Sequence, residues 1–293
     1  MAVVETGSFA AAGRKLNRAV SVISYGIENL EAQLGLTLFI REGTRKPVLT
    51  DAGHAVLADA QLVAGAVDAL RARSKGLLEG LEAEVTLVVD VFVPSDRLAE
   101  VLREFATEYP TVALRLHVET LGAVAGLVLD GVANLGVAGQ VAAQFEGLER
   151  QAAGAVSLVP VAAPHHPLAK ADKVRPGETG KHIQLVLADR SKLTAGKDFA
   201  VASPRTWRLA DLGAKHHLLK AGLGWGNMPL PMVEEDLERG SLVRLKLPDA
   251  PGGRFRFSTI NRTDNQPGPA TAWLRQRFID LGEEDVDAGL PDV

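Results

Sequence analysis

GSFAAAGRKLNRAVSVISYGIENLEAQLGL, residues 7–36, places two helical patterns on either side of a short turn at Asn17-Arg18. Ser8 is a residue type that caps helices, and it precedes a stretch from Phe9 to Leu16 with helical character. After the turn, apolar residues recur at intervals of three and four, which is typical of one stripe of an amphipathic helix: Val20, Ile23, Ile27, Leu30 and Leu34. The stretch therefore predicts a helix-turn-helix.

The physical use of this motif is to hold the second helix so that its free face can enter a DNA major groove. The side chains expected on that face or at its start are Arg18, Ser21, Ser24, Tyr25 and Glu28. We expect DNA contacts from the first four of these. A plain helical hairpin with no nucleic-acid partner is the alternative.

The next stretch, LFIREGTRKPVLTDAG at 38–53, has apolar residues on both sides of a basic loop that Gly43 and Pro47 interrupt. This pattern predicts a two-stranded wing. Basic side chains on a wing suit phosphate contacts, which position a protein on DNA without reading its sequence. The expected phosphate ligands are Arg41, Arg45 and Lys46. A solvated charged loop is the alternative.

Three motifs in fixed order carry a resemblance to a known family: AVVETGSF at 2–9, SYGIENLEAQLGLTLF at 24–39 and LTDAG at 49–53. In this order and spacing they resemble the LysR-type transcriptional regulators. The resemblance implies a DNA-binding regulator that responds to a small, anionic metabolite as its effector, works as a homodimer or homotetramer, and uses no cofactor.

The chain departs from the family pattern at its start and in the second helix. The family has about ten residues before AVVE, so we expect this chain to open within the family's first helix. Where the family commonly has Ser/Thr-Gln, this chain has Ala19-Val20, and valine can touch a thymine methyl but cannot hydrogen-bond to adenine. Gly26 costs that helix about 1 kcal/mol relative to alanine. A small-molecule-binding protein with impaired or lost DNA binding is therefore the alternative function.

The resemblance covers nearly the whole chain and implies an α/β protein: an N-terminal winged helix-turn-helix, a long linker helix and a two-lobed α/β effector domain similar to periplasmic binding proteins. The expected boundaries are 1–53 for the DNA-binding domain, 54–83 for the linker and dimerisation helix with its hinge, 84–282 for the effector domain and 283–293 for an acidic tail without periodicity. Lobe one is expected from 84–157 with 259–282, and lobe two from 158–258.

Composition agrees with such a protein. Residues 1–75 carry 9 basic and 7 acidic residues, whereas the remainder carries 23 and 29, so only the N-terminal part is mildly basic. The chain has no cysteine, which excludes disulfides and cysteine metal sites. No apolar run reaches the roughly 18 residues of a membrane span. We expect a cytoplasmic protein without membrane contact.

A long helix is expected from Thr50 to about Leu78. Its apolar residues alternate steps of four and three, which suits a seam between two helices: Val56, Ala60, Val63, Val67 and Leu70. The seam joins two copies of the chain in one interpretation, and packs onto its own domain in the other.

Beyond residue 84 the pattern alternates between strands and helices, which favours an open α/β sheet. Strands are expected at 84–93, 112–118, 134–139, 156–162, 182–188, 198–202, 242–247 and 254–261. Helices are expected after Ser95, after Thr120 and at 209–220, 231–239 and 269–281. GLGWG at 222–226 follows a helix and is interpreted as a helix stop and turn.

Ligands of such sheets bind beyond the carboxyl ends of the strands, where helix N-termini converge. Ser95 follows the first strand and Thr120 the second, so both are candidate donors to an anionic effector. Both match effector-facing positions of the resembled family, and ordinary N-capping is the alternative for each. Arg190 follows a strand of the second lobe and is a further candidate, with an exposed loop as its alternative.

Other chemistry has little support in the sequence. His165-His166 and His216-His217 are adjacent pairs, and neighbouring side chains point apart, so we expect no metal site. No Ser, His and Asp set lies in a recognisable nucleophile motif, so we expect no enzyme.

Overall fold

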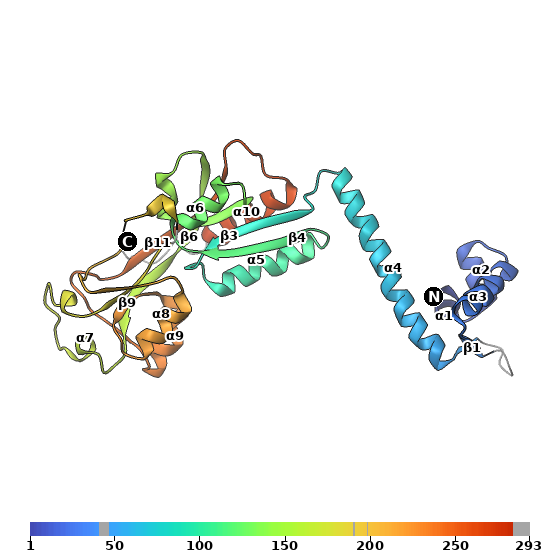
Figure 1. Ribbon diagram of the computed structural model, residues 1–293, viewed down its shortest axis with the longest axis horizontal. Coiled ribbons are helices and arrows are strands. Elements are labelled where there is room, and N and C mark those ends of the chain that lie inside the picture. The colour runs from blue at the N-terminus through green and yellow to red at the C-terminus, as the bar shows by residue number, and fades with distance from the viewer. Residues whose placement is uncertain (41–46, 190, 198, 284–293) are drawn as a thin grey trace. The chain divides into compact units, whose positions relative to one another are not determined.

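The computed structural model describes residues 1–40, 47–189, 191–197 and 199–283, and the chain divides into two compact units, residues 1–75 and the residues from Gly76 onward (Figure 1). Four predicted contact residues lie outside the described residues: Arg41, Arg45, Lys46 and Arg190. Residues 284–293 of the expected acidic tail lie outside them as well.

The N-terminal unit contains the predicted helix-turn-helix and the two wing strands. Its elements are α1 (Ala2–Thr6), α2 (Phe9–Leu16), α3 (Val20–Leu34), β1 (Phe39–Ile40), β2 (Val48–Leu49) and α4 (Asp51–Leu78). The Ser8 hydroxyl accepts a hydrogen bond from the backbone N–H of Ala11 at 3.1 Å, so the predicted cap of α2 is confirmed. Thr50 caps α4 in the same way, accepting from Gly53 N at 2.9 Å.

The core of this unit is small. It buries Val3, Ala12, Leu38 and Phe39, and from α3 only Ile23 and Ile27 pack against it. The other three members of the predicted apolar stripe are largely exposed: Val20 at 45%, Leu30 at 38% and Leu34 at 46%. The stripe prediction is therefore wrong for these residues. Only the central turns of α3 lie against the core.

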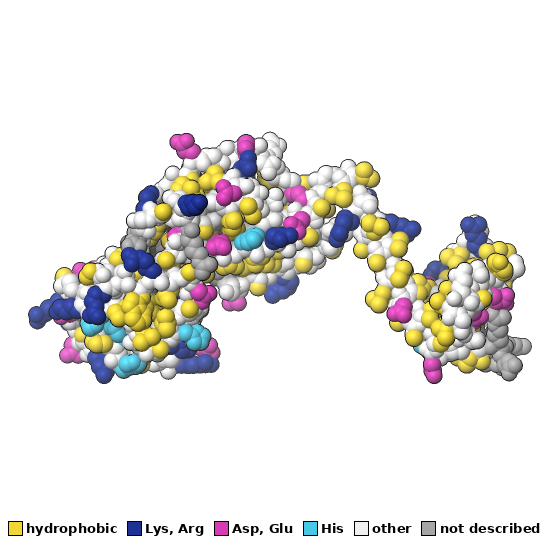
Figure 2. Space-filling view, in the orientation of Figure 1, with side chains coloured by type: hydrophobic (Ala, Val, Ile, Leu, Met, Phe, Trp, Pro, Cys, Tyr) yellow, Lys and Arg dark blue, Asp and Glu magenta, His cyan; other side chains and the backbone are white. Residues whose placement is uncertain are grey.

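α4 carries apolar side chains on its exposed surface, as the space-filling view shows (Figure 2). The exposed fractions are 73% for Leu62, 64% for Val63, 41% for Val67 and 64% for Leu70. Val63, Val67 and Leu70 of the predicted seam are therefore exposed, and the alternative of packing onto the chain's own domain does not hold for these three. Val56, at the start of the predicted seam, does pack, partly buried, against the core of the N-terminal unit.

The C-terminal unit is built on a nine-stranded mixed sheet, in the order β4-β3-β5-β11-β6-β9-β7-β8 with β10 beside β6. The first three strands run parallel, and the long β6 and β11 run antiparallel to each other. The strands are β3 (Glu84–Asp90), β4 (Ala113–Glu119), β5 (Leu135–Gly139), β6 (Leu148–Ala162), β7 (Gln184–Leu187), β8 (Thr206–Leu209), β9 (Trp225–Pro229), β10 (Val243–Arg244) and β11 (Gly253–Arg262).

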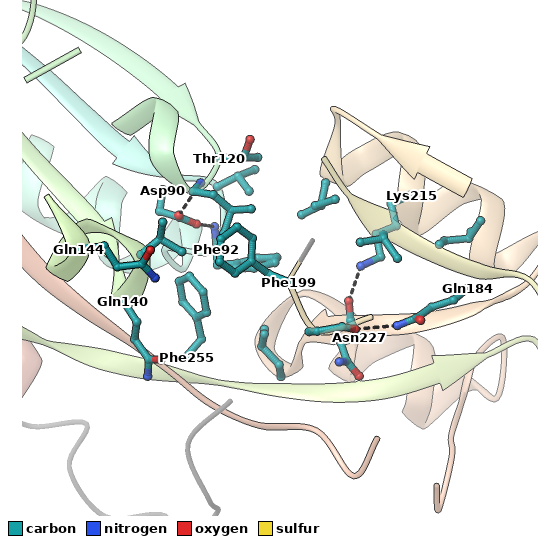
Figure 3. A pocket seen from close by; sticks show the side chains of 18 of the residues that line it. Asp90, Phe92, Thr120, Gln140, Gln144, Gln184, Phe199, Lys215, Asn227 and Phe255 are labelled. Atoms are coloured by element: carbon teal, nitrogen blue, oxygen red, sulfur yellow. Dashed lines mark hydrogen bonds between the residues drawn. The ribbon is translucent and has the colours of Figure 1, made fainter. Parts of the chain in front are cut away.

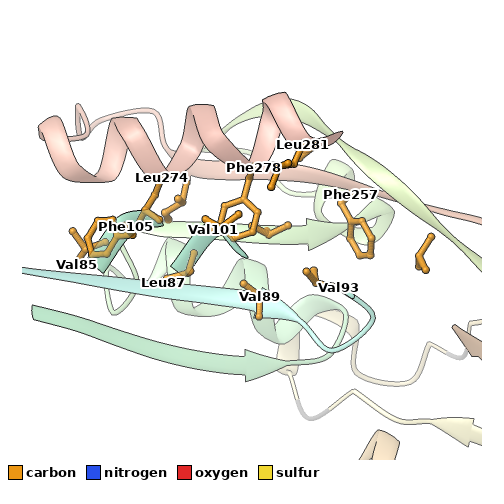
Figure 4. Packing of buried hydrophobic residues seen from close by; sticks show 14 of the residues in the cluster. Val85, Leu87, Val89, Val93, Val101, Phe105, Phe257, Leu274, Phe278 and Leu281 are labelled. Atoms are coloured by element: carbon orange, nitrogen blue, oxygen red, sulfur yellow. The ribbon is translucent and has the colours of Figure 1, made fainter. Parts of the chain in front are cut away.

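Helices pack on this sheet and form two lobes, each with its own hydrophobic core. The helices are α5 (Ser95–Glu108), α6 (Gly122–Leu129), α7 (Pro167–Lys170), α8 (Leu212–Lys220), α9 (Leu230–Arg239) and α10 (Pro269–Glu283), with short 3-10 turns η1 (Gln140–Gln144), η2 (Thr179–Lys181) and η3 (Lys192–Thr194). In lobe one, Leu274 and Phe278 of α10 pack against Val85 and Leu87 of β3 (Figure 4). Lobe two has its own clusters on β7, β9 and α8.

Two long strands connect the lobes. β6 leaves lobe one after Leu158, close to the predicted boundary at 157/158, because Leu158 packs in the lobe-one core and Val159 in that of lobe two. β11 already belongs to lobe one at Phe255 and Phe257, which pack in the lobe-one core. The prediction placed these two residues in lobe two. A continuous strand has no local mark at the point where it passes from one core to another.

One strand prediction was wrong, and one predicted turn is shorter than expected. The described residues 199–202 form no strand, because the Gln184 side chain takes their backbone groups: its amide N–H donates to Ala200 O, and its carbonyl accepts from Ala202 N, both at 2.8 Å. β8 follows at Thr206–Leu209 instead. The turn predicted at 222–226 does occur at Gly222, which has φ of 79°, but Trp225 then begins the buried strand β9.

Candidate functional site

The turn between α2 and α3 is fixed by close backbone packing. Asn17 adopts the left-handed conformation with φ of 54°, which asparagine tolerates better than most residues. Gly13 lies so close to the next segment that an added Cβ would sit 2.8 Å from Arg18 O. These contacts fix the orientation of α3 relative to α2.

The free face of α3 presents the predicted groove-facing residues. Tyr25 is 69% exposed, Ser21 is exposed and Ser24 is half-buried. Arg18 is exposed at the start of this face. The structure brings these four predicted residues onto the turn and the adjoining helix, which is the arrangement a groove-reading helix needs.

The structure explains two residues of the family-like motifs, Glu31 and Gly53, by the contacts that they make. The Glu31 carboxylate accepts hydrogen bonds from Leu38 N at 2.7 Å and Phe39 N at 3.2 Å, so it ties α3 to the start of the wing. Gly53 has no room for a side chain, because a Cβ there would lie 2.2 Å from Leu38 O. The wing strands β1 and β2 pair from Phe39 opposite Leu49.

The C-terminal unit holds a cavity of about 470 Å³ between its two lobes. Lobe one contributes the ends of β3 and β4, the turn η1, and Leu158 and Phe255. Lobe two contributes β7, residues 199–200, α8 and β9. Figure 3 shows Asp90, Phe92 and Thr120 on one side, and Gln184, Lys215 and Asn227 on the other. The walls are mostly apolar, as in most small-molecule sites.

Asp90 is the buried charge on the lobe-one side, with 1% of its surface exposed. Its carboxylate accepts from Phe92 N at 3.0 Å and from Leu121 N at 3.3 Å. Burial raises the pKa of the Asp90 carboxyl to about 7, these hydrogen bonds oppose the rise, and the nearby Asp189 charge adds to it. Asp90 is therefore only partly ionised at neutral pH.

Lys215 is the buried charge on the lobe-two side, with 3% of its surface exposed. Its Nζ donates to the backbone oxygen of Asn227 at 2.7 Å. Burial lowers the pKa of the Lys215 ammonium to about 7. The side-chain oxygen of Asn227 is also buried and accepts no hydrogen bond from the described residues. The Lys215 ammonium and the Asn227 side-chain oxygen can therefore each bind a ligand without breaking a bond to another side chain.

The start of α6 is already occupied by a side chain from the other lobe. Asp189 Oδ2 accepts from Gly122 N at 2.8 Å and from the Thr194 hydroxyl. The Thr120 hydroxyl donates to Ala188 O at 3.3 Å. Leu121, between them, has φ of 49°, an uncommon conformation for a residue with a side chain. These contacts join lobe one to lobe two beside the cavity.

The structure places the predicted effector ligands unequally. Thr120 borders the cavity, whereas Ser95 is exposed, begins α5 and is not among the residues that border the cavity. The predicted cap by Ser95 is also absent: Pro94 precedes α5 and no side-chain cap forms there. A tight turn follows Asp90, in which Val93 N donates to Asp90 O at 2.9 Å. Phe92 lies within this turn and borders the cavity, whereas Ser95 lies beyond it and does not.

Sequence reasoning missed Asp90, Lys215 and Asn227. Asp90 had a usable signal, since it is a carboxylate at the end of an otherwise apolar strand. Lys215 had none, because its helix also carries His216, His217 and Lys220, and nothing local shows which of these is buried.

The histidine pairs serve the framework of lobe two. His216 Nε2 lies 2.6 Å from Asp236 Oδ2, which ties α8 to α9. Burial raises the pKa of Asp236, but hydrogen bonds from Lys220, Ser241 and His216 outweigh it and bring the value to about 2. Among the residues that the structure describes, no three His, Cys, Asp or Glu side chains are grouped to hold a metal ion. No described helix is long and apolar enough to cross a membrane.

Comparison with known proteins gives two family matches. Residues 1–54 match the bacterial regulatory helix-turn-helix proteins of the lysR family, and residues 78–282 match the LysR substrate binding domain. The two matches follow the order that the sequence predicted, with a DNA-binding domain first and an effector domain after it.

Named relatives are transcriptional regulators. The HTH-type transcriptional regulator AceR of Acinetobacter baumannii is 29% identical over 248 residues, covering 83% of this chain and 81% of the relative. The HTH-type transcriptional regulator PunR of Escherichia coli is 26% identical over 284 residues, covering 95% of this chain and 90% of the relative.

Solved structures share the fold. Full-length LysG from Corynebacterium glutamicum, with its effector arginine bound, has a TM-score of 0.52 at 19% identity, covering 97% of this chain and 95% of that one. Full-length AphB, a virulence activator of Vibrio cholerae, has a TM-score of 0.52 at 21% identity, covering 96% of each chain. With the helix-turn-helix, the long α4 and the two-lobed sheet in place, this chain belongs to the LysR family of DNA-binding transcriptional regulators.

Proposed function

We propose that this chain changes transcription when a small metabolite fills the cavity between its lobes. The cavity itself is the main support, because its walls come from both lobes and a ligand inside it contacts both. Such a ligand favours whichever arrangement of the lobes binds it more tightly. Coupling between this change and DNA affinity then makes the metabolite a regulator.

The DNA partner is double-stranded, and α3 is the helix that reads it. Tyr25 and Ser21 are exposed on its free face, and Ser24 lies beside them. The wing residues Arg41 and Arg45 are proposed, from the sequence alone, to contact phosphates. A regulator of this kind works where the bacterial chromosome is, in the cytoplasm.

The working unit is a homodimer or homotetramer joined through α4. Leu62, Val63, Val67 and Leu70 expose apolar surface along this helix. A second copy of α4 can cover that surface with the same residues, as in a two-helix seam. Two DNA-binding units on one particle would then read two half-sites.

A gel-shift titration tests the DNA-binding half of the proposal. The whole chain is titrated against the DNA that flanks its own gene and against an unrelated duplex of equal length. We expect tighter binding to the flanking DNA, and loss of that preference in Tyr25→Ala. Equal binding to both duplexes, or binding to neither, would favour the alternative function, a small-molecule-binding protein with impaired or lost DNA binding.

A blocked cavity tests the metabolite-binding half. Leu187→Trp combined with Ala143→Trp adds bulk from both lobes, and Val132→Trp, which is 50% exposed and outside the cavity, is the control. A metabolite library of all charge classes is screened for compounds that raise the melting temperature and alter the gel shift. Such compounds should act on the parent and the control but not on the blocked variant. Equal action on all three would place the effector site elsewhere.

A further inference from the structure

The two sides of the cavity differ in electrical character. Asp90 lies on the lobe-one side, and Asp189 is close enough to influence its charge. Lys215 lies on the lobe-two side (Figure 3). An anionic ligand group would meet the Asp90 carboxyl and none of the described basic side chains at the first side, whereas it would meet Lys215 at the second.

The groups expected to hold an anion on the lobe-one side are already engaged. The first backbone N–H of α6, on Gly122, donates to Asp189 Oδ2 at 2.8 Å, so the protein's own carboxylate fills that position. The Thr120 hydroxyl donates to Ala188 O. A ligand carboxylate at this end would have to displace Asp189 and would then face Asp90.

Lys215 is a buried lysine with no carboxylate in ion-pair contact among the described residues. Its hydrogen-bond partner is the neutral backbone oxygen of Asn227, which leaves two of its three ammonium hydrogens available. Buried charges are normally paired, because an isolated one costs much of its hydration energy. The Asn227 side-chain oxygen, also buried, still lacks a donor.

Most of the space between these ends is lined by apolar side chains, with Gln140 and Gln144 of η1 as polar exceptions (Figure 3). Phe92 and Phe255 make an edge-to-face pair at 4.9 Å between ring centres, and Leu158, Leu185 and Val186 continue the wall. A ligand body that fills this space gains by burying apolar surface, about 25 cal/mol per Å². A second charged group on the body would find no second basic side chain among the described residues that border the cavity.

Resting on the proposed function, we infer that the effector is an apolar monocarboxylic acid whose carboxylate pairs with Lys215 while its body lies against the paired rings of Phe92 and Phe255. A hydroxyl next to the carboxylate would supply the donor that the Asn227 side chain lacks. Thr120, at the other end, contacts the body and not the acid group. The acid end of the effector is thus held by lobe two.

Matched acid and amide probes test this inference by calorimetric titration of the whole chain. The pairs are 3-phenylpropionate with its amide, mandelate with its amide, and 4-methylpentanoate with its amide; phthalate serves as a dianion. At least one acid should bind tenfold or more tightly than its amide, and phthalate should bind more weakly than that acid. Lys215→Met should remove the acid preference, and Lys246→Met, an exposed lysine of the same lobe, should keep it.

A measurement on the parent chain alone guards against misfolding of the variant. Burial lowers the pKa of Lys215 to about 7, and a carboxylate beside it favours the ammonium form, so binding at about pH 8 should take up protons, seen as a dependence of the heat on buffer ionisation. Amide probes should take up none.

The inference is overturned if no acid binds, if acid and amide bind equally, or if Lys215→Met keeps the preference. A neutral or cationic library compound that acts on the parent chain but not on the blocked cavity variant would contradict the inferred carboxylate. That result would leave the proposed function standing. Compounds that act equally on parent and blocked variant would instead remove the cavity as the effector site.

Discussion

Replacing Lys215 with methionine should stabilise the C-terminal unit at neutral pH. The folded state lowers the pKa of this ammonium from 10.5 to about 7, because the side chain is buried in an apolar cavity. Each pKa unit corresponds to about 1.4 kcal/mol, so the charged form costs the folded state about 5 kcal/mol at and below pH 7. Methionine has a similar length and no charge.

The hydrogen bond to Asn227 O offsets part of this gain. Its loss leaves a buried carbonyl without that donor, at a cost of about 1–3 kcal/mol. The net expectation for Lys215→Met is therefore a stabilisation of about 2–4 kcal/mol at pH 6.5.

The advantage of the variant should fall as the pH rises. Between pH 7 and 10.5 the unfolded chain binds a proton at Lys215 that the folded chain has released. The free energy of unfolding of the parent therefore increases with pH in this window, by up to about 1.4 kcal/mol per unit, whereas methionine does not titrate. Parent and variant should converge and then cross near pH 9.

Urea unfolding followed by tryptophan fluorescence measures this difference. Trp207, Trp225 and Trp273 all lie in the C-terminal unit, so the signal reports on that unit. Titrations run at several values from pH 6.5 to 9.5, with Lys246→Met as an exposed control that should stay within about 0.5 kcal/mol of the parent. A pH-independent difference, or a variant less stable than the parent at pH 6.5, would show that burial of the Lys215 ammonium does not destabilise the folded chain.

Three further predictions follow from the fold. Val63→Asp with Val67→Asp places two charges on the exposed apolar surface of α4, and we expect smaller particles in analytical ultracentrifugation; an unchanged mass would exclude the seam. Arg18→Ala should make the salt dependence of DNA binding shallower by about one unit of slope, whereas Ser24→Ala should reduce the preference for the target sequence and leave the slope intact. Gly122→Ala should destabilise the C-terminal unit by about 1–3 kcal/mol in urea unfolding, because its Cβ would lie 2.8 Å from a carboxylate oxygen of the opposite lobe; an unchanged midpoint would count against that contact.

The amino-acid sequence determined the local elements and their order. Ser8 and Thr50 cap helices through contacts within three residues, so the residue type alone indicates where α2 and α4 begin. The strand expected at 112–118 likewise forms, as β4, although Leu116 and Val118 on it are 38% and 53% exposed. The family-like motifs added the domain order, which the family matches confirmed.

Only the tertiary structure decided the ligand cavity. Lys215 and Asp90 are distant in sequence and meet the same cavity because β3, α8 and the crossing strands bring the two lobes together. Residues 199–202 form no strand because the Gln184 side chain hydrogen-bonds to their backbone. Phe92 borders the cavity, whereas Ser95 does not. These outcomes depend on contacts between distant segments, and no local periodicity records which lysine is buried or which carboxylate already fills a helix end.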